Sequence, residues 1–186
     1  MKIEFKNFNK NYPLHLACGL DDKIRTSLHY IMFKDGYAYA TNSYILVRAK
    51  LEDISNFDEE DINKLDGFYI HAQSFKAIQK SKGAVVIEEG QIRVRGEEYD
   101  VVYPLKDKFS CVRFPDCESV LSKGAVAEVT LQVEFGLNDR YLAILGDVMN
   151  AYNGVHMRWK SNNMFEVTPI GQNAKDIKGI IMTKMI

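Results

Sequence analysis

Histidine, cysteine and acidic residues are the side chains in this chain that could do covalent or metal chemistry. Four histidines stand far apart, at positions 15, 29, 71 and 156, and Cys18 follows His15 at a spacing that one helical face shares. No third ligand or base accompanies that pair, which favours a structural pair over a catalytic dyad or metal site. The acidic pair 21–22 and run 59–61 would suit Mg²⁺ in a nuclease, but they lack spaced partners. With no phosphate loop, G-x-S-x-G or dinucleotide fingerprint, the sequence predicts no enzyme, no cofactor and no metal.

Composition narrows the class of protein further. The 186 residues carry 24 basic and 25 acidic side chains, so no global basic field indicates a nucleic-acid partner. The chain is 46% hydrophobic, enough for a core without disulfides, and its three cysteines are typical of a reducing compartment. The first ten residues lack the apolar core of a signal peptide, and no apolar run approaches the ~20 residues of a membrane helix. We expect a soluble, cytoplasmic protein with no membrane partner.

Hydrophobic periodicity predicts a mixed α and β chain. Strands are expected at 2–8, on both sides of the turn at 34–36, at 43–51, at 68–71 and at 129–135. Two groups of three strands are also expected, from 84 to 105 and from 155 to 185. The expected helices are a weak one over 14–27, one over 72–82 that turns Phe75 and Ile78 inward, and one after the cap Asn138. Residues 51–66 read as an acidic connector or short helix.

These elements suggest three copies of one unit: a strand, a helix and three strands. We expect an α+β fold in which helices lie on one face of antiparallel sheets, with a two-unit domain at 1–122 (units 1–66 and 67–122) and a third unit at 123–186. A single such unit buries little surface, so neighbouring units should join sheet edge to sheet edge. The stretch VRFPDCESVL at 112–121 falls between units, where Pro115 and Asp116 predict a rigid turn.

Four segments resemble the bacterial DNA polymerase III β subunit, the sliding clamp. Residues 40–46 read ATNSYIL where the family's middle domain has ATDGHRL, and 114–121 read FPDCESVL where that domain ends in FPDY-x-x-V. Residues 135–149, FGLNDRYLAILGDVM, are similar to the third-domain helix FNxxYLLDALKAL. The end, GIIMTKMI, is similar to Y-V-(I/V)-M-P-M-R-L. The segments occur in family order and imply a shortened, DNA clamp-like chain with no counterpart of the first domain.

A sliding clamp encircles duplex DNA and tethers partner proteins to it without covalent chemistry. It needs helices whose cations balance phosphate charge without reading bases. The residues that would do this here are Lys23, Arg25, Lys76, Lys80, Lys82 and Arg140. An ordinary solvated helix face would carry the same lysines, so that alternative stays open.

The resemblance also implies a groove that binds short peptides of replication or repair proteins. The matching positions are Thr41, Ser43, Tyr44, Ile45, Leu46, Pro115, Ser119, Val120, Ile181 and Met182. Such a groove takes apolar anchors into pockets that are already formed. Alternatively, Leu46, Val120 and Ile181 are core residues.

Three functions therefore remain open from the sequence. The first is a clamp-like processivity or tethering factor that binds DNA without sequence preference and docks partners. The second is a clamp-fold interaction module that does not bind DNA, and the third is an unrelated α+β enzyme. Ring closure by several copies of the chain, as a homo-oligomer, and a monomer that has lost the ring are equally compatible with three units.

Overall fold

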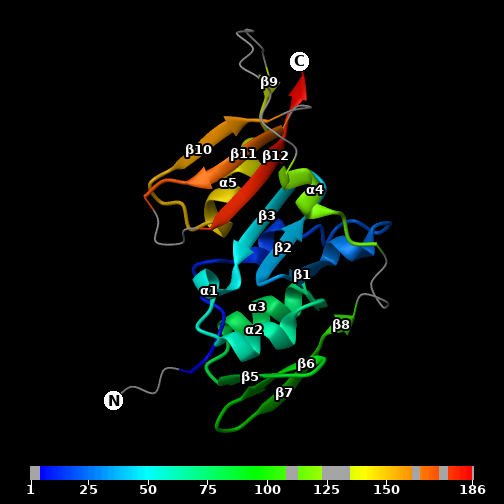
Figure 1. Ribbon diagram of the computed structural model, residues 1–186, viewed down its shortest axis with the longest axis vertical. Helices are drawn as coiled ribbons and strands as arrows, with labels where there is room; N and C mark the ends of the chain where they lie inside the picture. The colour runs from blue at the N-terminus through cyan, green and yellow to red at the C-terminus, as the bar shows by residue number, and fades with distance from the viewer. Residues whose placement is uncertain (1–4, 108–112, 123–134, 161–163, 172–175, 186) are drawn as a thin grey trace.

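The computed structural model describes residues 5–107, 113–122, 135–160, 164–171 and 176–185 (Figure 1). Its strands are β1 (Tyr30–Lys34), β2 (Tyr37–Thr41), β3 (Ile45–Lys50), β4 (Phe68–His71), β5 (Ala84–Glu88), β6 (Gln91–Arg95), β7 (Asp100–Pro104), β8 (Lys106–Asp107), β9 (Phe135–Gly136), β10 (Val155–Trp159), β11 (Met164–Pro169), β12 (Ile177–Met182) and β13 (Lys184–Met185). Its helices are η1 (Leu14–Ala17) and η2 (Thr26–His29), both 3₁₀, and α1 (Leu51–Ile54), α2 (Glu59–Leu65), α3 (Ala72–Lys80), α4 (Cys117–Ser122) and α5 (Asp139–Val148).

One antiparallel sheet of eight strands runs through the molecule in the order β10-β11-β12-β3-β2-β1-β4-β8. Two of its pairings join parts that are distant in the chain. Ile180 of β12 pairs with Leu46 of β3, and Ile31 of β1 pairs with Ile70 of β4. These pairings extend one sheet across segments that are distant in the chain, and the expected α+β antiparallel architecture is confirmed.

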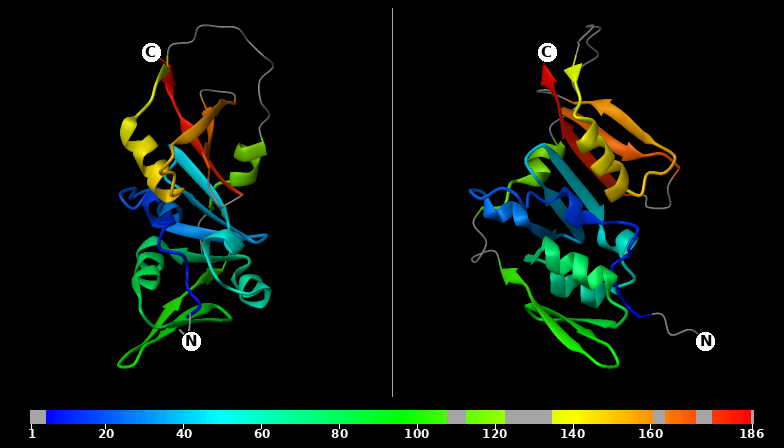
Figure 2. Two further views of the ribbon diagram at one scale, coloured as in Figure 1. Left: turned by 90° about the vertical axis from the view of Figure 1, so that its left-hand side faces the viewer. Right: turned by 180° about the vertical axis from the view of Figure 1, so that it is seen from behind.

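Helices cover one face of this sheet in a row. η1 contacts both α3 and α5, and the right-hand view of Figure 2 shows the three in a column on the same face. Strand alternation buries odd-numbered β3 and β12 residues such as Val47 and Ile181 against this layer. The even-numbered Leu46 and Ile180 point to the opposite face, where they pack with Cys117 of α4.

The sequence predicted most elements from β1 onward. The hairpin β1-β2 turns at Asp35 and Gly36, whose φ values of 51° and 77° lie in the left-handed region that an Asp-Gly turn favours. Helix α3 buries Phe75 and Ile78 as expected. The expected boundary between residues 122 and 123 lies beside the undescribed segment 123–134 and stays a prediction. Most of the strand expected at 129–135 falls in that segment and so lies outside the described residues.

The first unit differs from the prediction. The helix expected over 14–27 is instead two 3₁₀ turns separated by a loop, because Gly19 and the Asp21-Asp22 pair interrupt a helical run. Of the strand expected over 2–8, residues 1–4 lie outside the described residues. The described part forms one isolated bridge, between Phe8 and Ser55.

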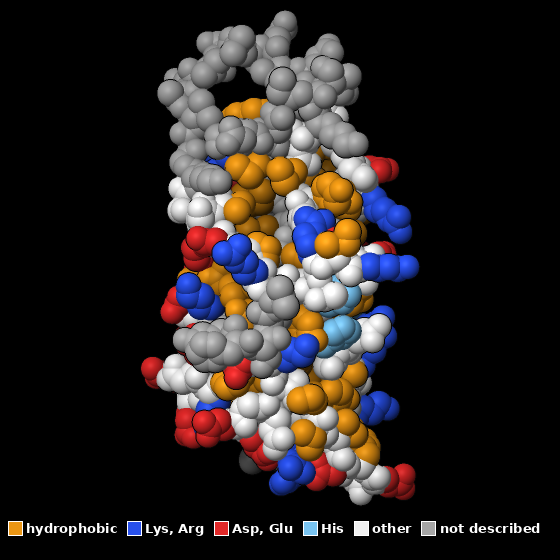
Figure 3. Space-filling model, turned by 90° about the vertical axis from the view of Figure 1, so that its right-hand side faces the viewer, with side chains coloured by type: hydrophobic (Ala, Val, Ile, Leu, Met, Phe, Trp, Pro, Cys, Tyr) orange, Lys and Arg blue, Asp and Glu red, His pale blue; other side chains and the backbone are white. Residues whose placement is uncertain are grey.

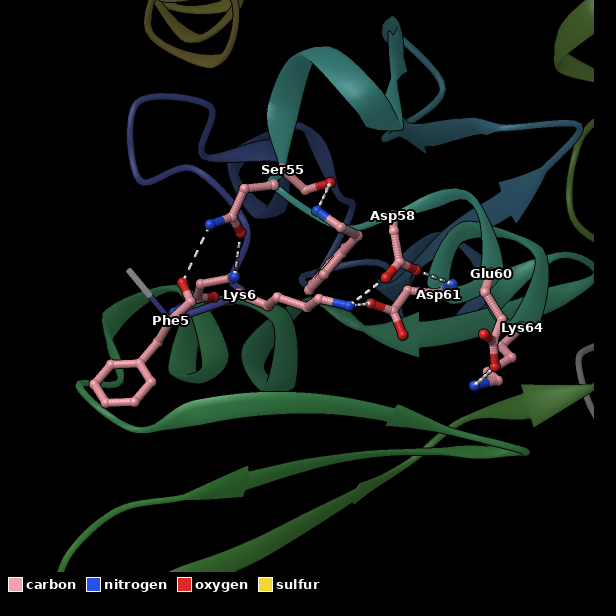
Figure 4. Close-up of polar contacts among 10 residues, drawn as sticks. Phe5, Lys6, Ser55, Asp58, Glu60, Asp61 and Lys64 are labelled. Carbon is pink, nitrogen blue, oxygen red and sulfur yellow. Dashed lines mark hydrogen bonds and ion pairs between the residues drawn. The ribbon is translucent and has the colours of Figure 1, made fainter. Parts of the chain in front are cut away.

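An ion cluster fixes the N-terminal segment against α2 (Figure 4). The ammonium group of Lys6 lies 2.6 Å from a carboxylate oxygen of Asp58 and 2.6 Å from one of Asp61. These two carboxylates raise the pKa of Lys6. Asp58 also caps α2 by accepting the backbone N–H of Asp61. The cluster thus links the start of the chain to the helix that packs on β5.

Two glycines near the contact between α5 and the sheet should respond oppositely to alanine. A Cβ on Gly179 of β12 would lie 3.0 Å from Leu145 Cδ2 and 3.2 Å from the carbonyl oxygen of Leu46, whereas one on Gly146 of α5 would meet nothing within 4 Å. We expect Gly179→Ala to lower the free energy of unfolding by about 1–3 kcal/mol through overpacking. Gly146→Ala should raise it by about 0.5–1 kcal/mol through helix propensity. Urea unfolding measures both, and a stabilised Gly179→Ala variant would contradict the close packing.

Candidate docking groove and cationic face

Three separate segments meet at a cavity of about 340 Å³ on the α4 side of the sheet. The segments are the β2-β3 loop, the FPD turn with α4, and strands β11 and β12. The cavity, called the docking cavity below, is lined by Thr41, Ser43, Tyr44, Ile45, Leu46, Pro115, Cys117, Val120, Met164, Ile180 and Met182. Most of these side chains are apolar, as in a site for an apolar anchor. Figure 3 shows hydrophobic side chains gathered around a hollow in the upper half of one side of the molecule.

Local hydrogen bonds fix the β2-β3 loop at the cavity. Asn42 Oδ1 accepts the backbone N–H groups of Tyr44 and Ile45, each at 3.0 Å. Thr41 Oγ1 donates to the Ile45 carbonyl at 2.7 Å. Ser43 has a φ of 77°, a conformation that favours glycine, which the sliding-clamp pattern has at this position. The Met182 N–H donates to the Tyr44 carbonyl at 2.9 Å and thereby joins this loop to β12.

Polar contacts at both ends hold α4, which forms another wall of the cavity. Glu118 accepts a hydrogen bond from the Tyr39 hydroxyl and lies 3.5 Å from the guanidinium of Arg48. At the other end, Lys160 donates to the Leu121 carbonyl at 3.0 Å. Burial of Tyr39, and then its hydrogen bond to Glu118, raise the pKa of its hydroxyl. The helix was not predicted, but the predicted turn is present, and Asp116 Oδ1 accepts the Ser119 N–H.

Eight of the ten predicted groove positions line the docking cavity. Ile181 does not, because it lies on the helix-covered face of β12 with 0% of its surface exposed, and its neighbour Ile180 takes its place. Ser119 is exposed on α4 outside the lining. The resemblance missed Cys117, Met164 and Ile180. The register that pairs Ile180 with Leu46 puts Ile180, and not Ile181, on the cavity face of β12.

The predicted DNA-binding residues, unlike the groove residues, lie on several separate elements. Lys76 and Lys80 are exposed one turn apart on α3, whereas Lys82 lies beyond the helix and lines another cavity with Arg95. Lys23 and Arg25 lie in the loop before η2, where Arg25 pairs with Asp22 at 2.7 Å. Arg140 is exposed in the first turn of α5 and, among the described residues, forms no ion pair. The structure thus places Lys76 and Lys80 on one helix and Lys82 just beyond it, with Lys23 and Arg25 in one loop and Arg140 on another helix.

The charge on α3 also acts on His15 of η1. Burial, then the charges of Lys76 and Lys80, lower the pKa of this imidazole to about 4. Its Nδ1 is buried without a hydrogen-bond partner in the described part of the chain. The row of helices therefore carries a local positive potential near α3, although the chain as a whole is almost neutral.

Antiparallel sheets joined across repeated units, with helices in a row on one face, define the class of clamp-fold proteins. Solved structures with this fold are the β subunit of DNA polymerase III from Thermotoga maritima (10% identity, TM-score 0.55), the β subunit of the DNA polymerase of Streptococcus pyogenes (11%, 0.59) and the DNA polymerase sliding clamp of Bacillus subtilis (10%, 0.58). The matches cover 96%, 100% and 100% of this chain and 64%, 67% and 66% of those chains.

The chain therefore has the fold of bacterial sliding clamps over about two thirds of their length. No protein-family model matches the sequence, and no curated protein matches it either. Within the described residues, no three His, Cys, Asp or Glu side chains form a group that could hold a metal ion. No helix in that same part of the chain is long and apolar enough to cross a membrane.

The low pKa of His15 should make stability depend on pH. A free histidine titrates near pH ~6.5. Between there and about pH 4, the unfolded chain binds a proton at His15 that the folded chain does not, so the free energy of unfolding should fall as the pH drops. We expect His15→Gln to lose less stability than the wild type between pH 7 and pH 5, as measured by urea unfolding. The remaining loss includes His71, whose pKa burial also lowers. Equal losses in the two proteins would contradict this assignment.

Proposed function

We propose that the chain is a clamp-fold tethering protein that docks a short apolar peptide of a partner protein in the docking cavity. One observation carries this proposal: residues 41–46, 115–120 and 180–182, far apart in sequence, meet at one apolar cavity. A preformed pocket of this kind holds buried side-chain anchors, while the fixed backbone around it sets their direction. Replication and repair proteins in a bacterial or phage cytoplasm are the partners that the sliding-clamp resemblance suggests.

The helix row is the proposed surface for duplex DNA. Lys76 and Lys80 present two cations one turn apart, and their field lowers the pKa of His15. Contacts of this type neutralise phosphates without reading bases, which suits a protein that moves along DNA. Several copies would be needed to surround a duplex. β7 and β10 are outer strands of their sheets among the described residues, so pairing of such edges is the proposed route to a homo-oligomer.

A docking module that does not bind DNA is the second candidate. Its support is that carboxylates offset several of the predicted DNA-binding cations. Arg25 is already paired with Asp22, and the exposed Asp139 and Asp147 lie on α5 with Arg140. The docking cavity serves equally well in both candidates, so DNA binding is the property that separates them.

Replacement of exposed side chains at the docking cavity tests peptide docking. Tyr44 and Met182 line the cavity and are 51% and 45% exposed, so their truncation should leave the fold intact. We expect Tyr44→Ala with Met182→Ala to weaken binding of a synthetic clamp-docking peptide from a bacterial polymerase by about tenfold or more. Isothermal titration calorimetry measures the change. Tyr152→Ala, at a tyrosine that is 88% exposed and outside the lining, is the control. Equal binding by all three proteins would rule out this cavity.

Charge reversal on α3 tests DNA tethering. Lys76→Glu with Lys80→Glu should abolish most of the association with a random-sequence duplex at low salt. It should also reduce the slope of log K against log salt by about 2, since each phosphate contact releases counterions. Fluorescence anisotropy across a salt series gives both quantities. The control is Lys34→Glu with Lys64→Glu, which makes the same change in charge away from the helix row. No binding by the wild type, or equal loss in both variants, would favour the module that does not bind DNA.

A further inference from the structure

A second cavity lies on the other side of the FPD turn. It has a volume of about 390 Å³, and Pro115 and Cys117 line both it and the docking cavity. The rest of its lining comes from β1 and its turn, the residues around the start of β4, Phe114, Asp116 and Glu118. A peptide whose apolar anchor fills the docking cavity therefore reaches this second site by crossing the FPD turn.

The second cavity is acidic, and we call it the acidic cavity. Four carboxylates line it, from Asp35, Asp66, Asp116 and Glu118, against one ammonium group, that of Lys34. Lys34 is half-exposed and approaches Asp35 only to 3.8 Å, while Glu118 already faces Arg48. Asp66 and Asp116 form no ion pair with any described residue, so they contribute charge that is not neutralised locally.

Backbone donors fix these two carboxylates in place. Asp66 Oδ1 accepts the N–H of Asp35 at 2.6 Å, and Asp116 Oδ1 accepts the N–H of Ser119 at 3.1 Å. Burial, and then the charges of Asp116 and Glu118, raise the pKa of the neighbouring Cys117 thiol to about 12. Carboxylates held in this way need little reordering to receive a cation.

Apolar and aromatic side chains supply the rest of the cavity wall. Met32, Phe33, Tyr69 and Phe114 line it, and the rings of Tyr69 and Phe114 lie 5.7 Å apart between centroids. Lysine and arginine match this combination, because their methylene stems pack on apolar surface while the charged end meets carboxylates or a ring face. A neutral or acidic side chain would gain only part of these contacts.

We propose that the acidic cavity binds a lysine or arginine of the partner segment, a few residues from the apolar anchor in the docking cavity. The proposal rests on the docking function above and adds a charge preference to it. The FPD turn then separates a subsite for an apolar side chain from a subsite for a cationic side chain. Partners are selected by both features together.

Two matched double variants and three peptides test this preference. The peptides are synthetic, share a Leu-Phe anchor in an alanine-rich sequence, and carry lysine, glutamine or glutamate at both flanks. Asp66→Asn with Asp116→Asn removes two charges but keeps an oxygen acceptor for each N–H donor, so the turn and the α4 cap persist. Glu97→Gln with Glu98→Gln removes the same charge from the remote β6-β7 turn.

We expect the wild type and the Glu97/Glu98 variant to bind the lysine peptide roughly three- to fivefold more tightly than the glutamine peptide, and the glutamate peptide least. The Asp66/Asp116 variant should lose this order while it keeps its affinity for the glutamine peptide, and salt should weaken the preference. Equal wild-type affinity for the lysine and glutamine peptides overturns the charge preference but leaves the docking function standing. Failure of all three peptides to bind the wild type overturns both.

Discussion

The antiparallel pairing of β12 with β3 is the constraint on which the rest of the structure depends. It joins the last part of the chain to the first unit through five residue pairs, from Ile177 with Ala49 to Ile181 with Ile45. A unit of a strand, a helix and three strands buries little surface by itself, and this pairing lets the last part of the chain share a core with the first. It also brings Met182 beside Tyr44, so the docking cavity exists only when the pairing has formed.

Alternation along the paired strands then decides what each face does. Odd-numbered residues such as Val47 and Ile181 enter the core beneath α5, and the even-numbered Leu46 and Ile180 lie under α4 and at the cavity. Apolar runs buried on both faces give no alternation of polarity by which sequence could separate the two roles. Ile181 and Ile180 are chemically identical neighbours, and only the register with Leu46 distinguishes a core residue from a cavity residue.

Polar contacts on the outer face of the sheet hold α4 in place as a wall of the docking cavity. Arg48 lies over the ring of Tyr37 and pairs with Asp176 at 3.0 Å as well as with Glu118. These partners come from β2, α4 and the start of β12, so one guanidinium links three segments around the site. Five fixed donors suit arginine to such a junction. The FPD turn lies directly before α4, with an apolar cavity on one side and an acidic one on the other.

Sequence by itself determined the local features: the Asp-Gly hairpin, most strands from β1 onward, the Asn138 cap and the amphipathic helices α3 and α5. Each follows from neighbouring residues, through turn chemistry and hydrophobic period. The resemblance also indicated eight residues of the docking cavity. Tertiary structure alone decided the 3₁₀ turns of the first unit, the short helix α4 and the choice between Ile180 and Ile181. Those outcomes depend on strand register and on contacts such as Glu118 with Arg48, which join residues 70 positions apart and leave no local pattern.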